Sequence, residues 1–275
     1  MKKILVLLVL ISVAFTSVMA QSRGGTQSGG ASSIKAPSFN GTTGLYSIPT
    51  GYIGWEGSNN LALDIGYRAI IGDRGISHIP SLTLSLFKFV EISSAFDIQT
   101  RPDDNDLLFG AKIRLPTRTT AIALGMNMHL LRMNRNNGNT TFQPYIAITY
   151  PGSFFSMPAE TTLVIGKTFF SNSNSIDSNI DFGMGFDIVL LPDVFNNILH
   201  LILDFSNFAY SYNAFPGGSG AAAHRGVFNA GFRLDLSQLP PFRKYKFIVD
   251  FAFNDILDDG SRAFTAGAVF GIPFM

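Results

Sequence analysis

From Asn60 to the end of the chain, apolar and polar residues alternate with a period of two. The alternation is cleanest over residues 179–190, where Ile180, Phe182, Met184, Phe186, Ile188 and Leu190 share one face. Such a pattern predicts β-strands with one apolar and one polar face. The predicted strands, about twelve in number, cover residues 60–70, 79–86, 89–99, 106–115, 120–131, 141–150, 160–170, 179–190, 197–209, 226–236, 245–256 and 263–274. Only 160–170 is interrupted, because Lys167 falls on the face of Leu163 and Ile165.

The length and polar face of these segments indicate which kind of sheet they form. Several run to roughly ten residues, the length that a tilted strand needs to cross a bilayer. Their polar faces carry Gly, Ala, Asn, Ser and Asp rather than the Lys and Glu that coat soluble sheets. We therefore predict an all-β fold, a transmembrane antiparallel up-and-down β-barrel. A soluble β-sandwich or lipocalin-like barrel also alternates and remains the alternative.

The connections support the barrel, because long and short ones alternate along the chain. The polar connections near residues 101–106, 132–140 and 210–225 are mostly longer, whereas those near 87–89, 116–119 and 192–197 are mostly shorter and often contain Pro. Outer-membrane barrels have long loops outside and short turns in the periplasm. An even number of strands would leave both ends of the barrel on the periplasmic side.

The first residues are typical of a secretory signal peptide. Lys2 and Lys3 precede the apolar run Ile4 to Phe15, and small residues lead to a predicted cleavage site after Ala20. Residues 1–20 are thus predicted as a signal peptide. Residues 21–59 are predicted as a flexible N-terminal segment that either plugs the lumen or forms a periplasmic entry element, and residues 60–275 as the barrel. The expected location is the outer membrane of a Gram-negative-type cell.

The last segment alternates up to Phe274 and resembles the C-terminal assembly signal of bacterial outer-membrane proteins. The resemblance implies a partner, the outer-membrane assembly machinery, in addition to outer-membrane lipid. Met275 departs from the usual terminal Phe.

Composition narrows the function classes. Charged residues make up 14% of the chain, against roughly 25% in soluble domains. The chain has no Cys, so neither disulfides nor thiolate metal sites are possible. A formal net charge of +1 gives no indication of nucleic-acid binding. The 26 Phe residues, against one Trp, suggest that Phe and Tyr form the aromatic girdles.

No catalytic arrangement is recognisable, so we expect neither an enzyme nor a cofactor or metal. His129 and His200 fall on polar faces, and His200 lies too far along its strand from Asp204 for a direct hydrogen bond. A lipid-modifying enzyme using one of these histidines is the weakest alternative. The acidic run 103–106 lacks calcium-loop spacing and is predicted to be a solvated loop.

The stretch GTTGLYSIPTGYIGWEGSNNLALDIGYR, residues 41–68, is similar to the opening of YjbH-type outer-membrane barrels, a family associated with exopolysaccharide production. The resemblance covers about a tenth of the chain, and the residue after Pro49-Thr50 is Gly where the family has Ala. It implies that Gly44, Leu45, Pro49 and Thr50 form a structural entry element, and it identifies no ligand.

Charged residues of both signs are predicted to line the lumen: Asp64, Arg68, Glu91, Asp97, Lys112, Arg114, Asp181, Asp187, Asp204, Arg233, Asp235 and Asp250. They either pair across the interior and close it or form a narrow polar channel. Small residues on the same faces, Gly110, Gly183, Gly185, Gly231, Gly267 and Gly271, leave room for water and favour the channel. The predicted function is a porin-like channel for small polar solutes or saccharide. The alternative is a closed barrel that acts as a structural or surface-interaction protein through extracellular loops such as 210–225.

Overall fold

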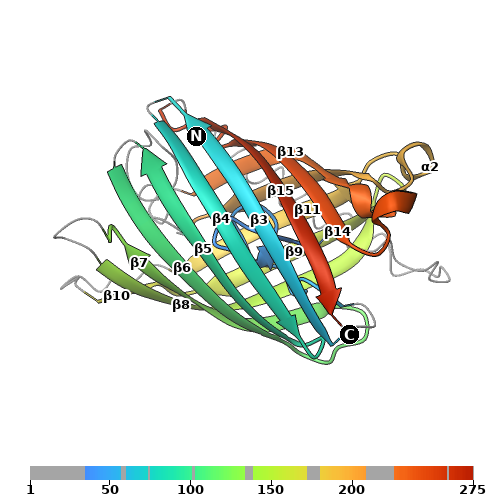
Figure 1. The fold of residues 1–275 in the computed structure, drawn as a ribbon, viewed down its shortest axis with the longest axis horizontal. Helices are drawn as coiled ribbons and strands as arrows, with labels where there is room; N and C mark the ends of the chain where they lie inside the picture. The colour runs from blue at the N-terminus through green and yellow to red at the C-terminus, as the bar shows by residue number, and fades with distance from the viewer. Residues whose placement is uncertain are drawn as a thin grey trace.

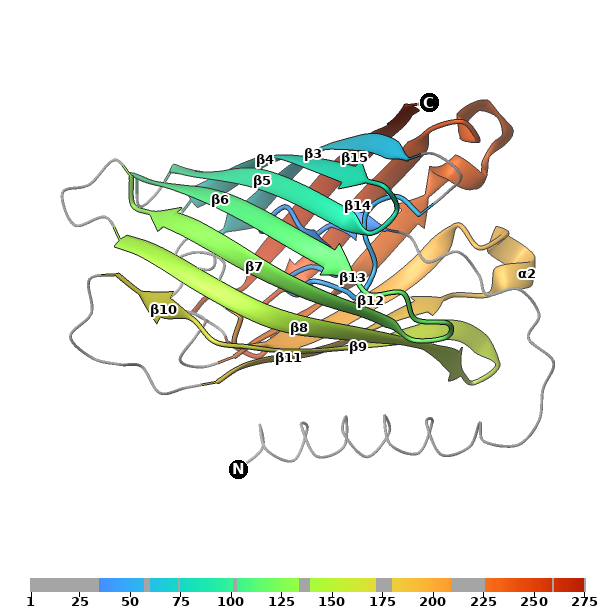
Figure 2. The same cartoon turned by 90° about the horizontal axis from the view of Figure 1, so that it is seen from below.

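The computed structural model describes residues 35–56, 60–73, 75–100, 103–133, 139–171, 180–208, 226–258 and 260–274. Within these residues, long antiparallel strands form a closed barrel (Figure 1 and Figure 2). They are β3 (Leu61–Gly72), β4 (Gly75–Leu86), β5 (Val90–Thr100), β6 (Asp103–Arg114), β7 (Ala121–Leu131), β8 (Asn139–Phe154), β9 (Met157–Gly166), β11 (Asp181–Val189), β12 (Leu199–Ser206), β13 (Val227–Asp235), β14 (Lys246–Asn254) and β15 (Ala263–Phe274).

Within the part of the chain that the structure describes, closure of the ring leaves no long strand with a free edge. β15 pairs with β3 over its whole length, and β8 pairs with β9 from Tyr145↔Gly166 to Phe154↔Met157. The short β10 (Phe169–Phe170) pairs with the other end of β8. Complete pairing is what a bilayer demands, because hydrocarbon cannot hydrogen-bond to an open edge. The predicted twelve-stranded, antiparallel, all-β barrel is confirmed.

Two local expectations are corrected. The acidic run 103–106 is the start of β6 rather than a loop, and Asp106 accepts a hydrogen bond from the Arg132 amide at 2.7 Å. The interruption at Lys167 disappears because β9 ends at Gly166. Both differences arise because pairing with a neighbouring strand, which the local pattern does not contain, decides where a strand begins and ends.

The two rims of the barrel differ in their connections. The rim that holds the C-terminal end of β15, here called the turn rim, carries short turns, α2 (Pro192–Phe195), η2 (Leu236–Gln238) and η3 (Pro240–Phe242). Between β8 and β9, Phe155 and Ser156 both have positive φ, the geometry of a two-residue hairpin that follows the sheet twist. The opposite rim is called the loop rim. The predicted interaction loop 210–225 and the predicted signal peptide are outside the described residues.

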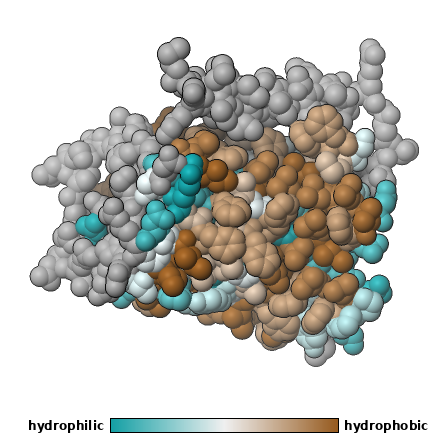
Figure 3. All heavy atoms as spheres, turned by 90° about the horizontal axis from the view of Figure 1, so that it is seen from above, coloured by the Kyte–Doolittle hydropathy of each residue, from teal (hydrophilic) through white to brown (hydrophobic). Residues whose placement is uncertain are grey.

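The outer surface of the barrel is apolar. Outward side chains such as Leu82 (48% exposed), Ile113 (52%) and Ile165 (57%) come from β4, β6 and β9. Figure 3 shows apolar residues over much of the described surface on one side, with hydrophilic residues mainly toward the ends. Such a surface is unfavourable in water and suits lipid. Among the described residues, no helix combines the length and apolar character needed to span a bilayer.

Residues 35–56, here called the plug segment, lie inside the ring of strands, as the blue trace in Figure 2 shows. The segment folds back on itself twice: β1 (Ala36–Pro37) pairs with β2 (Thr43–Gly44), and Gly44 forms a bridge with Pro49. Asn40 stabilises the first turn by accepting hydrogen bonds from the Ser38 hydroxyl and from Thr42.

The plug segment also brings an apolar core into the lumen. Its core side chains, Phe39, Leu45, Tyr46 and Ile48, are fully or almost fully buried and cluster with inward-facing wall residues, among them Ile70, Ile79, Leu108, Val227 and Ala252. Burying each large apolar side chain contributes about 1.5–3 kcal/mol. The interior is therefore a packed core at this level, and not only a polar lining.

Candidate functional site

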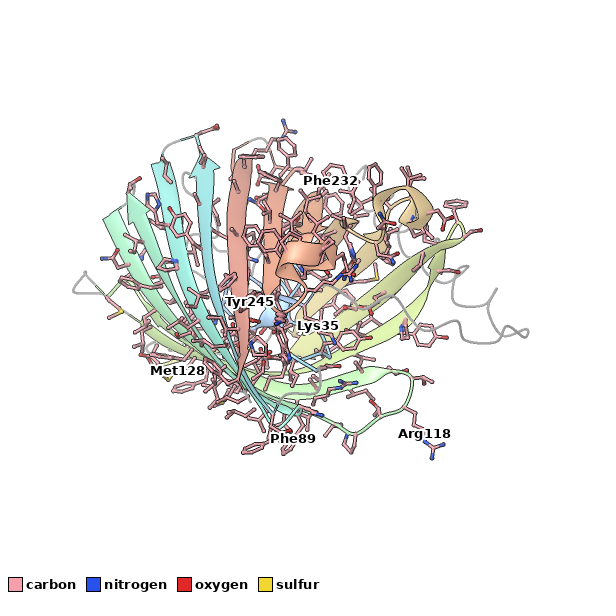
Figure 4. The ribbon with its side chains drawn as sticks, turned by 45° about the vertical axis from the view of Figure 1, so that its right-hand side comes forward. Lys35, Phe89, Arg118, Met128, Phe232 and Tyr245 are labelled. Atoms are coloured by element: carbon pink, nitrogen blue, oxygen red, sulfur yellow. The ribbon has the colours of Figure 1, made fainter. Side chains whose placement is uncertain are left out.

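The candidate site is the lumen where the plug segment meets the charged wall. Figure 4 shows Lys35 toward the middle of the barrel, whereas Phe89 and Arg118 lie at its periphery. The wall side chains come from the inward positions of β3, β5, β6, β12, β13 and β14, which period-two alternation aims at the lumen.

One group of contacts holds the plug segment near the turn rim. Glu91 accepts hydrogen bonds from the backbone amides of Thr43 and Gly54, each at 2.8 Å. Lys112 lies 3.4 Å from the Glu91 carboxylate and donates to the carbonyls of Thr43 (2.9 Å) and Thr50 (3.3 Å). All four backbone groups are thereby paired with a buried charge, which stabilises irregular chain away from water.

A second group lies around Asp250. This carboxylate is bracketed by Arg233 (Nε to Oδ1, 2.7 Å) and Arg68 (Nη2 to Oδ2, 2.5 Å). The two guanidinium groups also reach the plug segment: Arg233 donates to the Gly44 carbonyl at 3.1 Å and Arg68 to the Pro37 carbonyl at 2.5 Å. One wall carboxylate therefore fixes two cations that both bind plug carbonyls.

On β12, Asp204 binds the second turn of the plug segment. It accepts hydrogen bonds from the amides of Tyr46 and Ser47, from the Ser47 hydroxyl, and from Asn229 of the neighbouring strand. The Tyr46 hydroxyl lies 3.2 Å from the carbonyls of both Phe232 and Phe251. This turn thus contacts three adjacent strands.

The two ends of the plug segment are joined by an ion pair between Glu56 and Lys35 at 3.1 Å, and Glu56 also pairs with Arg114 of β6. Burial lowers the pKa of Lys35, although Glu56 opposes this effect. Burial raises the pKa of Tyr52 above its ordinary value, and the negative charge of Glu160 adds to the effect. Beside them, Lys246 pairs with Asp64 at 2.6 Å and donates to the Gly54 carbonyl.

The twelve predicted lumen residues separate into two sets. Eight act on the plug segment directly or through a partner, namely Asp64, Arg68, Glu91, Lys112, Arg114, Asp204, Arg233 and Asp250. The other four bond to wall groups: Asp97 to Ser77 and Gln99, Asp181 to Thr168, Asp187 to His200, and Asp235 to Ser237 and Gln238. Arg114 is the least buried of the twelve and lies at the turn rim.

The glycines of the wall have a different role from the one expected. A Cβ at Gly110 would lie 2.3 Å from Thr42 Cγ2, at Gly183 2.5 Å from Ile48 Cγ2, and at Gly185 2.3 Å from Leu45 Cδ1. At these positions the space is taken by the plug segment rather than by water. At Gly267 and Gly271 it is taken by Arg68 and Asp64 of the wall.

Several functional residues were not among those predicted. Lys246 shares the inward face of β14 with Asp250, so the alternation alone could have identified it. The sequence pattern does not mark Tyr46, Ser47 and Glu56 of the plug segment. This segment is held by side chains of the wall and does not form a regular element with a periodic pattern.

No family model and no curated protein sequence matches the chain. Among solved structures, the NanC porin has 9% identity and a TM-score of 0.51, over 77% of this chain and 100% of that one. The KdgM porin in complex with disordered oligogalacturonate has 11% identity and a TM-score of 0.49, over 77% and 99%. Omp33, an outer membrane protein of Acinetobacter baumannii, has 9% identity and a TM-score of 0.46, over 77% and 97%. In its fold, this chain is similar to the outer-membrane porin barrels.

Proposed function

We propose that the protein is an outer-membrane channel for small polar solutes, closed by the plug segment in the state described and opened when that segment shifts. The observation that carries the proposal is the nature of the contacts. Charged wall side chains bind plug carbonyls and amides, as Glu91 and Arg233 do. Water can replace a backbone group as the partner of such a charge, so these contacts can exchange when the segment moves.

The exterior and interior of the barrel support the same function. Lipid-facing apolar strands enclose a lumen with carboxylate, guanidinium and ammonium groups, which is the construction of a selective polar pore. The NanC porin, whose fold this chain shares, is a channel by its name, which supports the channel part of the proposal. The signal peptide, cleavage after Ala20 and recognition of the last strand by the assembly machinery belong to the same proposal.

A closed barrel with a structural or surface-interaction role is the second candidate, and one observation favours it. The Arg68–Asp250–Arg233 group is at most 1% exposed. The plug carbonyls of Gly44 and Pro37 bind these guanidinium groups away from water, and each buried group left unpaired costs about 1–3 kcal/mol. If the plug segment never moves, the barrel conducts nothing.

A disulfide between the plug segment and the wall distinguishes the two candidates. A Cβ at Gly183 would lie 3.5 Å from the Cβ of Ile48, within the range of about 3.5–4.5 Å found in disulfides. The natural chain has no Cys, so Ile48→Cys with Gly183→Cys gives one defined pair. In planar bilayers we expect conductance steps from the reduced protein, silence after oxidation, and recovery with reductant.

Ile48→Cys alone is the matched control and should conduct under both conditions. Folding of each variant is checked by heat-modifiable gel migration. A folded but silent protein in the reduced state would support the closed barrel. Steps that continue unchanged after complete cross-linking would show that the plug segment is not the gate.

A further inference from the structure

Part of the barrel wall carries buried polar atoms that the plug segment does not pair. Among the described residues, buried atoms without a hydrogen-bond partner include six on the inward faces of β4, β5, β7 and β8: Ser81 Oγ, Ser85 Oγ, Ser93 Oγ, Asn127 Oδ1, His129 Nε2 and Thr141 Oγ1. Each belongs to a side chain that is at least nine-tenths buried. Unpaired buried polar atoms are unfavourable, and these six lie on two pairs of adjacent strands, β4 with β5 and β7 with β8, on either side of β6.

Four of these side chains lie close together through the strand register. A Cβ at Gly110 of β6 would lie 2.5 Å from Ser93 Oγ and 3.2 Å from Asn127 Oδ1, so both groups point over that glycine from either side. In the next register row, His129 of β7 lies directly opposite Thr141 of β8. Ser93, Asn127, His129 and Thr141 are together called the polar track.

The polar track adjoins the plug segment and an aromatic pair. Thr42 lies over Gly110, between Ser93 and Asn127. Along β8, the inward position two residues beyond Gln143 is Tyr145, whose ring covers Gly125 and meets Phe208 edge-on at a centroid distance of 6.0 Å. Convergent polar groups beside aromatic side chains are the usual composition of a small-molecule site.

The charges of the lumen are engaged elsewhere. Lys112, Lys246 and Arg233 each bind a wall carboxylate and a plug carbonyl. The polar track itself offers hydroxyl groups, an amide oxygen and an imidazole nitrogen, which donate to and accept from hydroxyl groups. A carboxylated solute would instead be matched by guanidinium or ammonium groups.

We propose that the polar track is a binding subsite for a neutral polyhydroxylated solute, a sugar or polyol, next to the plug segment. The inference rests on the proposed function, since it names the solute class that this channel passes. Thr42 takes the space over Gly110 in the state described, so a solute reaches Ser93 and Asn127 as Thr42 moves away with the plug segment.

Saturation-transfer NMR with maltotriose tests the subsite, using the whole protein in micelles of a sugar-free detergent. We expect transfer to the ring protons of maltotriose. Ser93→Ala and Thr141→Val each remove one hydroxyl with little change of shape and should weaken binding roughly two- to tenfold, the range for one neutral hydrogen bond. Met128→Leu, between Asn127 and His129 on the outward face of β7, is the control and should bind like the natural protein.

The opposite results overturn the inference. Absence of transfer to maltotriose in a folded barrel would show that the polar track is an internal filler, and transfer unaffected by Ser93→Ala and Thr141→Val would place binding elsewhere. Equal or stronger transfer to trigalacturonate, with the same sensitivity to these variants, would exclude a neutral-solute class. Because binding is measured without transport, a barrel that binds maltotriose but never conducts contradicts the proposed function and leaves this inference standing.

Discussion

Asp204 of β12 and Ser47 of the plug segment are joined by two hydrogen bonds, from the Ser47 amide to Oδ2 at 2.8 Å and from the Ser47 hydroxyl to Oδ1 at 2.9 Å. The same carboxylate accepts the Tyr46 amide at 2.8 Å. A single wall side chain thus binds one complete turn of the plug segment. Carboxylates are suited to this role because their two oxygens can accept several N–H and O–H donors at once.

Asp204→Asn is expected to loosen the plug segment without unfolding the barrel. An amide nitrogen would replace one acceptor oxygen and face N–H donors, and each buried group left unpaired costs about 1–3 kcal/mol. Hydrogen exchange followed by mass spectrometry should show faster exchange at Tyr46 and Ser47. Asp193→Asn, on the exposed α2, is the control. Exchange equal to that of the natural protein would mean that Asp204 does not hold this turn.

Gly183→Val is expected to displace the plug segment rather than narrow an open pore. Its side chain would overlap Ile48, and overpacking of this kind costs about 1–3 kcal/mol. Adding Ile48→Ala should restore much of the loss, because it removes the overlapping methyl. Resistance of the plug segment to limited proteolysis provides the measurement. Gly260→Val serves as control, since a Cβ there meets only Asp258 Oδ1 at 3.7 Å. Failure of the second substitution to restore resistance would argue against direct contact.

Glu91→Leu should weaken the plug segment more than Lys112→Met. Loss of Glu91 leaves Lys112 as a buried charge without its carboxylate and two amides without an acceptor, a type of change that costs about 3–5 kcal/mol. Loss of Lys112 leaves Glu91 still bound by both amides, so we expect about 1–3 kcal/mol.

Urea titration followed by the fluorescence of Trp55 measures this difference, because Trp55 is the only Trp and belongs to the plug segment. Its ring lies 5.2 Å from Lys246 Nζ, so release of the segment changes its surroundings. Equal midpoints for Glu91→Leu and Lys112→Met, or a lower midpoint for Lys112→Met, would contradict the assignment of Glu91 as the main acceptor.

Leu82→Arg tests whether the outer face meets lipid. Leu82 lies outward near the middle of β4 and is 48% exposed. Arg near the bilayer midplane costs about 2–4 kcal/mol, and about 0–1 near the interface. In lipid vesicles, the refolded barrel should therefore be less stable with Leu82→Arg. Its stability should change little with Leu239→Arg, a position beside η3 on the turn rim. Unaltered stability of Leu82→Arg would favour a surface in contact with water.

The strands and their faces followed from the amino-acid pattern alone. Side-chain direction in a strand alternates residue by residue, so local order suffices to assign Leu82 to the outside and Asp204 to the inside. The same alternation puts Lys246 on the inward face that Asp250 occupies. The strand ends did not follow from it, because those of β6 and β9 depend on pairing with neighbouring strands, as Asp103 pairs with Thr100 and Gly166 with Asp181.

The contents of the lumen and the partner of each charge depend on contacts between distant parts of the chain. Ser47 and Asp204 are 157 residues apart, and no periodic pattern connects an irregular segment to a distant strand. The glycines that suggested open space, Gly110, Gly185 and Gly183, face Thr42, Leu45 and Ile48 of the plug segment. That segment meets these glycines only when the ring of strands closes around it. Ring closure is a property of all the strands together, and the interior of the barrel exists only once it has formed.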